Sequence, residues 1–331
     1  MSDYPAIRAR HLYHRYDEHS VLHDVTFDVG RGEIFGFIGP NGAGKTTTIR
    51  IMSTLLEPSA GRVEIDGIDV TMRPDQVRRI IGYMPDHAGV YDRVTVREYL
   101  EFFTAAYGVA SPAVVDAVIE LTDIGRLQDA LVATLSKGQK QRLQLARILL
   151  HDPQVLILDE PASDLDPRAR IEIRNLLLDL KNLGKTILLS SHILSELSDV
   201  CTSVGIIERG RMVVSGPIGE IGDRLAAVRA APEAASPVTQ EAFLRTVRVR
   251  LIGDLDAAAD RLVETPFVLE VELVGAALSV SYGGGDERVA EMVALLVGEG
   301  FGVVGVEQEQ NQLERIFLEA TRGRSTPSET P

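Results

Sequence analysis

A glycine-rich loop directly follows a short apolar run near the start of the chain. Residues 33–38 read Glu-Ile-Phe-Gly-Phe-Ile, which is typical of a buried strand, and residues 39–48 continue as Gly-Pro-Asn-Gly-Ala-Gly-Lys-Thr-Thr-Thr. Glycines let the backbone curl so that its N–H groups point at an anion, and a helix that begins there adds its positive end. Lys45 adds a cation, and the Thr46 hydroxyl can bind Mg²⁺. The segment predicts a phosphate-binding loop more strongly than an ordinary glycine turn before a helix.

A second apolar run ends in two acidic residues. Residues 155–158 are Val-Leu-Ile-Leu, and Asp159 and Glu160 follow at once. At the carboxyl edge of a parallel sheet, where nucleotides bind, Asp159 is expected to hold Mg²⁺ directly or through water. Glu160 is expected to orient the attacking water as a general base. Taken alone, the segment is equally consistent with an apolar strand that ends in a solvated acidic pair.

A third segment opens a long helical pattern. Residues 135–139 read Leu-Ser-Lys-Gly-Gln, and Gly138 lies 21 residues before Asp159. The hydroxyl of Ser136 and the N–H of Gly138 at a helix start form an anion site, which suggests phosphate binding from a second face. On its own, the segment is more simply explained as a helix with Ser136 as its N-cap.

Together, these segments resemble the nucleotide-binding subunit of ATP-binding cassette (ABC) transporters over about residues 5–228. The order Walker A, signature, Walker B, D-loop and His-loop is complete. By this resemblance Tyr16, 29 residues before Lys45, stacks on adenine, and residues 135–139 close over the γ-phosphate of ATP held by a partner subunit. Residues 163–166 form the D-loop, which crosses the dimer interface, and His192 contacts the γ-phosphate. The resemblance implies ATP and Mg²⁺ as cofactors and ATP hydrolysis as the activity.

The expected site residues fall into three groups. The catalytic residues are Glu160 and His192, and the metal ligands are Thr46, Asp86 and Asp159. The remaining residues are expected to bind ATP: Tyr16, Gly39, Pro40, Asn41, Gly42, Ala43, Gly44, Lys45, Thr46, Thr47, Asp86, Ser136, Lys137, Gly138, Gln139 and Asp166.

Three positions depart from the family pattern. Asp86 stands where glutamine is usual, and its carboxylate is expected to keep the metal role while changing the coupling to a membrane partner. Lys137 replaces a glycine in the signature, where a cation could either favour ATP further or point to solvent. Asp164 stands where a small residue is common and adds charge at the interface. None of the three removes a group needed for hydrolysis.

The fold class expected is α/β: a P-loop NTPase of the ABC ATPase type with a helical subdomain, followed by a small α+β domain. The nucleotide-binding domain is expected over residues 1–228, with its helical subdomain at about 88–150. A linker rich in alanine and proline is expected at 229–242, an accessory domain at 243–322 and a disordered tail at 323–331.

Alternating apolar patterns continue beyond the linker. Their order is strand, helix, strand, strand, helix, strand, which is the ferredoxin-like order. A final amphipathic segment, residues 313–321, resembles the closing helix of ABC ATPases that drive export permeases for drugs, antibiotics or lipids. The role expected for this domain is dimer contact or regulation.

Composition excludes several classes of function. The formal charge of −14 argues against non-specific nucleic-acid binding, because phosphate neutralisation needs Lys and Arg. No apolar run approaches the roughly 18 residues of a membrane span. The single cysteine, Cys201, is expected to be a buried thiol in a reducing compartment. The histidines at positions 11, 14, 19 and 23 lack the companions of a metal site.

The sequence therefore predicts an ATPase subunit that dimerises on ATP binding, as a homodimer or with a second ATPase subunit. It is expected to power a separate integral-membrane permease that exports a drug, antibiotic, lipid or similar substrate. Its expected location is cytoplasmic, peripheral on the inner face of the cell membrane. The alternative is a soluble ABC ATPase that acts on ribosomes or nucleic acid.

Overall fold

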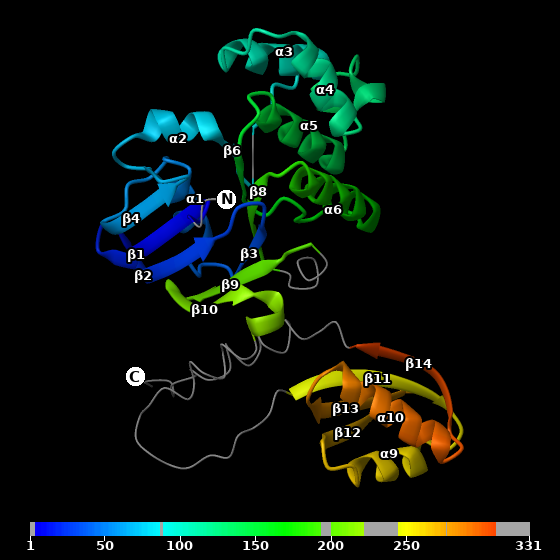
Figure 1. Ribbon diagram of the computed structural model, residues 1–331. Coiled ribbons are helices and arrows are strands. Elements are labelled where there is room, and N and C mark those ends of the chain that lie inside the picture. Colours follow the sequence, from blue (N-terminus) through cyan, green and yellow to red (C-terminus); the bar gives the residue numbers. More distant parts are fainter. Residues whose placement is uncertain (1–3, 87–88, 193–199, 222–243, 276, 309–331) are drawn as a thin grey trace, which may run out of the picture. The chain divides into compact units, whose positions relative to one another are not determined.

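The computed structural model describes residues 4–86, 89–192, 200–221, 244–275 and 277–308. The chain divides into two compact units, Met1–Ile221 and Gly222–Pro331, which are described separately. Figure 1 traces the chain from blue at its start to red in the second unit. The linker, the 313–321 helix and the polar tail expected from the sequence lie outside the described residues.

The first unit begins with a four-stranded antiparallel sheet in the order β2-β1-β4-β5. Its strands are β1 (Ile7–Tyr16), β2 (His19–Val29), β4 (Ala60–Ile65) and β5 (Ile68–Asp69). Ile7 and Ala9 are fully buried between more exposed neighbours, as expected for a sheet with one covered face. The second half of β2 alternates buried Val25, Phe27 and Val29 with more exposed residues.

A six-stranded sheet forms the centre of the unit, in the order β10-β9-β3-β8-β7-β6. Its strands are β3 (Ile34–Ile38), β6 (Ile81–Met84), β7 (Val155–Leu158), β8 (Thr186–Ser191), β9 (Ser203–Glu208) and β10 (Arg211–Pro217). All neighbouring pairs are parallel except β9 and β10. Every residue of β3, β7 and β8 is buried, which explains why the first two are continuous apolar runs.

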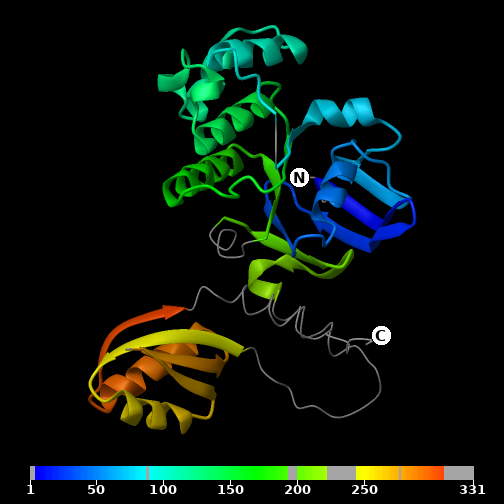
Figure 2. The same ribbon diagram turned by 180° about the vertical axis from the view of Figure 1, so that it is seen from behind.

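The longer helices of this unit follow the central strands. They are α1 (Lys45–Met52), α2 (Pro74–Ile80), α3 (Val96–Ala106), α4 (Ala113–Leu121), α5 (Lys137–Leu149) and α6 (Pro167–Asn182). Within the helical subdomain expected at about 88–150, the described residues form α3, α4 and α5, joined in part by 3₁₀ turns at Gly125–Leu127 and Val132–Thr134. Figures 1 and 2 show α3, α4 and α5 grouped away from the antiparallel sheet, with α6 beside α5 in both views.

The two sheets share one apolar core. Phe27 of β2 stacks on Phe35 and Phe37 of β3, with 5.4 Å between ring centroids in each pair. Ile49 and Ile51 of α1 are fully buried in the same cluster. Burying side chains of this size contributes about 1.5–3 kcal/mol each relative to exposure, so this core fixes the loop between β3 and α1.

The second unit is a β-α-β-β-α-β domain. Its elements are β11 (Leu244–Ile252), α9 (Leu255–Val263), β12 (Val268–Val274), β13 (Ala277–Gly283), α10 (Asp286–Gly298) and β14 (Gly302–Gln308). The sheet order is β12-β13-β11-β14 and all neighbours are antiparallel, which is the ferredoxin-like arrangement expected from the sequence. Val247, Val280 and Leu262 lie in its own apolar core. No helix among the described residues is long and apolar enough to cross a membrane.

Candidate functional site

Four neighbouring strands of the central sheet end at one edge. The parallel ladders place Ile38 of β3 opposite Ser191 of β8, and Leu158 of β7 opposite Leu189 of β8 and Met84 of β6. The segments that follow these strands therefore emerge together at the carboxyl edge. They are the glycine loop after β3, Asp86 after β6, the acidic pair after β7 and His192 after β8. The topology thus gathers residues that are far apart in the sequence.

The glycine loop leads directly into α1. Gly44 is the N-cap of this helix and has φ of +104°, a conformation that favours glycine. Lys45 begins the helix, and only 5% of it is exposed. Its Nζ donates to the carbonyl oxygen of Gly39 at 2.6 Å and lies 3.6 Å from Oε1 of Glu160. The buried ammonium therefore lies between the loop backbone and the acidic pair.

Asp159 is almost fully buried at the end of β7, with 1% of the residue exposed. Ser190 of β8 donates from Oγ to Oδ1 of Asp159 at 2.6 Å, and the carboxylate also bonds the side chain of Thr46. Burial raises the pKa of Asp159, the charges of Glu160 and Asp86 raise it further, and the two hydroxyl bonds oppose the rise. Thr46, Asp86 and Asp159 thus lie in one electrostatically coupled group of oxygen donors.

Glu160 lies between two basic side chains. Its Oε1 faces Lys45 at 3.6 Å, and its Oε2 lies 2.8 Å from Nδ1 of His192. Its backbone has φ of +50°, an uncommon conformation for a non-glycine residue, and its N–H donates to Oγ of Ser190 at 2.9 Å. The carboxylate is thus held from several sides while 14% of the side chain stays exposed.

Tyr16 ends β1, and 40% of it is exposed. Its ring contacts the buried ring of His14 edge-on, with 4.6 Å between centroids. His14 faces Leu22 across the β1–β2 ladder, and Leu22 lies against Gly44 closely enough to leave no room for a Cβ there. The exposed ring of Tyr16 is therefore connected to Gly44 of the phosphate loop through the side chains of His14 and Leu22.

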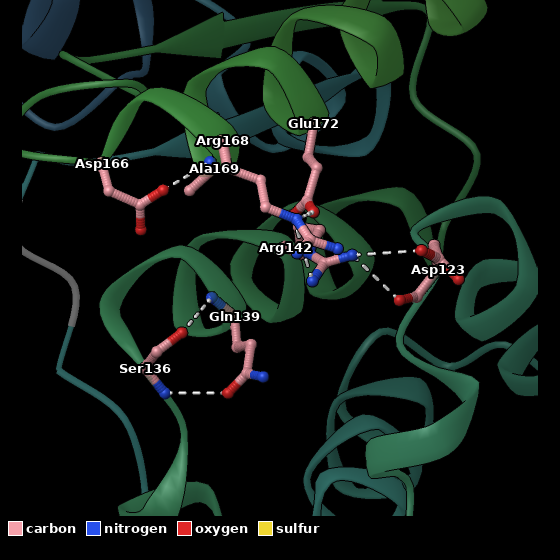
Figure 3. Close-up of polar contacts among 8 residues, drawn as sticks. All are labelled: Asp123, Ser136, Gln139, Arg142, Asp166, Arg168, Ala169 and Glu172. Carbon is pink, nitrogen blue, oxygen red and sulfur yellow. Dashed lines mark hydrogen bonds and ion pairs between the residues drawn. The ribbon is translucent and has the colours of Figure 1, made fainter.

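The segment 135–139 forms the start of α5, where a capping box is complete. Gln139 donates its N–H to Oγ of Ser136 at 3.3 Å, and Ser136 donates its N–H to Oε1 of Gln139 at 2.9 Å (Figure 3). Within the described part of the chain, Lys45 and Ser136 share no hydrogen-bonding or ionic partner. The structure thus bears out the N-cap that the sequence suggested.

The starts of α5 and α6 pack closely together. A Cβ on Gly138 would lie 2.7 Å from Cβ of Ala169, so a larger residue would force the helices apart. Asp166 caps α6 by accepting from the N–H of Ala169 at 2.9 Å. Arg142 of α5 and Glu172 of α6 form an ion pair, with 3.3 Å between Nη2 and Oε2. Figure 3 shows the two side chains between the helices.

The site contains one important residue that the sequence did not single out. Ser190 is fully buried and bridges Asp159 and the backbone of Glu160. The pair of serines that follows the apolar residues of β8, directly before His192, was the available signal. Cys201 is buried as expected, and burial raises the pKa of its thiol.

The glycine loop, its lysine and the two strand-end acids define a P-loop nucleotide-hydrolysing protein. Residues 22–163 match the model of the family described as "ABC transporter". A Nod factor export ATP-binding protein I from Burkholderia pseudomallei is 40% identical over 205 residues, which cover 61% of this chain and 67% of that protein. The one from Cupriavidus metallidurans is 33% identical over 319 residues, covering 95% of this chain and 97% of that protein.

A solved ATP-binding subunit of an ABC transporter has the same fold. It is 33% identical, with a TM-score of 0.61, and the match covers 68% of this chain and 95% of that one. The chain belongs to the ATP-binding subunits of the ABC transporter family. ATP binding, ATP hydrolysis and the P-loop fold predicted from the sequence are thereby confirmed at the level of the family.

Proposed function

We propose that this chain hydrolyses ATP within a dimer and thereby drives a separate membrane permease that exports its substrate. The observation that carries this proposal is the position of Glu160 between Lys45 and His192. Its Oε1 lies 3.6 Å from Nζ of Lys45, and its Oε2 lies 2.8 Å from Nδ1 of His192. This arrangement places a carboxylate base next to both a phosphate-binding cation and a histidine. The arrangement suits transfer of the γ-phosphoryl group of ATP to water.

Each side chain then has a distinct part in hydrolysis. Glu160 accepts a proton from the attacking water and aligns it with the γ-phosphorus. Lys45 offsets the charge on the phosphate oxygens, and His192 holds the carboxylate through Oε2 and reaches the γ-phosphate. Tyr16 stacks on adenine. No covalent enzyme intermediate is needed, because positioning and charge stabilisation lower the barrier.

The oxygen donors beside this group suit Mg²⁺. Thr46 supplies a hydroxyl, and Asp159 and Asp86 supply carboxylates, which are the hard ligands that this ion prefers. The buried Asp159, whose pKa is raised by burial and by neighbouring acids, is the group that a divalent cation would compensate. Bound there, the metal would neutralise charge on the phosphates.

The dimer is inferred from the family resemblance of the phosphate loop at Lys45 and the signature at residues 135–139. Among the described residues, Lys45 contacts Gly39 and Glu160, whereas Ser136 bonds Gln139. We infer that ATP bound at Lys45 of one subunit is covered by residues 135–139 of the other, with the D-loop at the interface. The remaining residues expected to bind ATP retain this assignment as a proposal: Gly39, Pro40, Asn41, Gly42, Ala43, Gly44, Thr46, Thr47, Asp86, Lys137, Gly138, Gln139 and Asp166.

An exposed aromatic cluster supports the binding of a protein partner near α3. Tyr91 is 57% exposed and packs against Phe102 and Phe103, with ring centroids 5.5 Å and 6.2 Å away. Phe102 is itself 54% exposed. Aromatic residues are enriched at protein interfaces, so we propose this cluster as part of the contact with the permease. The subunit then works on the inner face of the cell membrane.

The export direction rests on the relatives, whose names concern Nod factor export. The alternative of a ribosome- or nucleic-acid-directed ATPase is less favoured, because the charge of −14 opposes binding to phosphate backbones. Purification separates the two: the proposal expects the native protein with a multispanning membrane protein, and the alternative expects it with ribosomes or nucleic acid.

The variant Glu160→Gln tests the catalytic assignment. It keeps the size of the side chain and removes the base, so we expect phosphate release to fall by about 100-fold or more. Because ATP is then bound without being consumed, the variant should form a stable dimer with Mg·ATP but not with Mg·ADP. Phosphate assays and analytical ultracentrifugation measure the two effects. Near-normal turnover, or a monomer at saturating Mg·ATP, would refute the proposal.

A further inference from the structure

Two of the three residues that depart from the family pattern contact each other. Nζ of Lys137, in the first turn of α5, lies 2.9 Å from Oδ2 of Asp164, in the D-loop before α6. The exposed fractions of their side chains are 46% and 79%. The ammonium of Lys137 in the signature therefore forms an ion pair with the carboxylate of Asp164 in the same chain.

The surrounding packing fixes the distance between the two loops. Gly138, next to Lys137, lies against Ala169, which allows α5 and α6 to approach closely. Arg142 further along α5 lies 3.3 Å from Glu172 of α6 (Figure 3). The ion pair thus joins two segments that are already held side by side, and forming it orders only the two side chains.

The backbone at Asp164 does not require an aspartate. Its φ is +54°, a region in which glycine, asparagine and aspartate are all tolerated. A glycine or asparagine would satisfy the backbone equally well. The backbone conformation alone therefore does not select aspartate, and Asp164→Asn removes the charge while keeping the size and the backbone preference.

We propose that Asp164 is a positioning residue that holds the ammonium of Lys137 until ATP on the other subunit displaces it. This inference rests on the proposed function, in which residues 135–139 cover that ATP. As the triphosphate approaches, the γ-phosphate oxygens compete with the carboxylate for the same cation. Asp164 thereby sets the ATP concentration at which the dimer closes, and a small neutral residue there would leave Lys137 available at lower ATP.

The test measures closing of the full-length dimer in the Glu160→Gln background. Analytical ultracentrifugation across a Mg·ATP titration gives the ATP concentration of half-maximal dimerisation. We expect Lys137→Gln to raise this ATP concentration about tenfold and Asp164→Asn to lower it about threefold, since each variant changes one charge near the triphosphate. Lys137→Arg keeps the cation and should stay within about twofold of the parent.

A double-mutant cycle separates positioning from direct repulsion. If Asp164 acts through Lys137, then Asp164→Asn has little effect, below about twofold, once Lys137 is glutamine. An equal or larger effect in that background means that the carboxylate repels the nucleotide directly, and it overturns the proposal. In chains with Glu160 intact, Asp164→Asn should lower KM for ATP without raising kcat, a split that a merely structural change does not produce.

Failure of this inference is distinguishable from failure of the proposed function. If the Glu160→Gln protein with both loops intact does not dimerise on ATP, the dimer itself is refuted. If it dimerises normally and neither loop variant moves the midpoint by more than about twofold, only the role of the ion pair is refuted.

Discussion

One hydroxyl group links Asp159 and Glu160 to the neighbouring strand. Oγ of Ser190 donates to Oδ1 of Asp159 at 2.6 Å and accepts the backbone N–H of Glu160 at 2.9 Å. The same atom therefore orients the proposed metal ligand and fixes the left-handed backbone of the proposed base.

We expect Ser190→Ala to lower kcat by about 10- to 100-fold with a smaller change in KM for ATP. The reason is that misplacing a general base costs rate in this range, while the groups that bind the nucleotide remain. Steady-state phosphate release measures both constants. Ser203→Ala is the matched control, because Ser203 is a buried serine of β9 in the same sheet whose Oγ donates to Glu33 instead. Equal kinetics for the two variants would contradict the role of Ser190.

Asp159 is expected to serve ATP hydrolysis while lowering the free energy of unfolding of the metal-free protein. Its pKa is raised by burial first and by Glu160 and Asp86 next. A carboxyl whose folded pKa lies above its unfolded value contributes stability at pH below the unfolded value, and this contribution is lost as pH rises through the folded pKa. At neutral pH without a metal, the ionised Asp159 therefore lowers the free energy of unfolding.

Asp159→Asn should thus raise the free energy of unfolding of the nucleotide-free protein, by about 1 kcal/mol at neutral pH. The gain should shrink as pH falls, because the folded carboxyl, whose pKa is raised, takes up its proton at a higher pH than the unfolded one. The same variant should lose hydrolysis and the stabilisation by Mg·ATP. Denaturant unfolding at several pH values, with and without Mg·ATP, measures these effects. A variant less stable than the parent at neutral pH would contradict the prediction.

The central sheet was readable from the sequence because its strands are buried on both faces. The runs at 34–38 and 155–158 are continuously apolar and end in the residues that do chemistry, so pattern and motif agree. The β1–β2 ladder was harder to predict, because it shifts register between Ala9 and Leu12, next to the left-handed residue His11. A register shift interrupts the alternation of apolar and polar residues on which strand prediction depends.

Contacts between segments that are distant in the sequence could not be predicted from the residue pattern. Ser190 is 31 positions from Asp159, and Lys137 is 27 positions from Asp164. The sequence indicated that Lys137 and Asp164 were unusual and placed the Asp164 charge at the interface, but it left open where the Lys137 charge pointed. Only the close packing of α5 on α6, which depends on Gly138 and Ala169, brings the two together.

The exposed ring at the end of β1 offers a test of nucleotide stacking. We expect Tyr16→Ala to raise KM for ATP about tenfold, because stacking of a base on an aromatic ring is worth about 1–3 kcal/mol. Tyr16→Phe keeps the ring and should behave like the parent, and kcat should change little in both. Tyr13→Ala is the matched control, since Tyr13 lies on the same strand and is 42% exposed, against 40% for Tyr16. An equal rise in KM for both alanine variants would contradict the assignment.

We expect His151 to make the stability of the first unit depend on pH. Its Nε2 lies 2.8 Å from the carbonyl oxygen of Ile81 in β6, and its ring packs against Tyr107 of α3's C-terminus at 4.5 Å between centroids. Burial lowers the pKa of His151 below its ordinary value of 6.5. A lowered folded pKa means that the stability is present above the unfolded value and is lost as pH falls through the folded pKa.

The parent protein should therefore lose stability as pH falls below about 6.5, because the unfolded chain binds a proton that the folded chain resists. His151→Gln cannot take up that proton, so its unfolding midpoint should fall less steeply over this range. At about pH 8 the variant should be the less stable of the two, by on the order of 1 kcal/mol, because its packing against Tyr107 is poorer. Thermal unfolding followed by circular dichroism at each pH measures both effects. Parallel pH profiles for the two proteins would show that His151 does not carry the dependence.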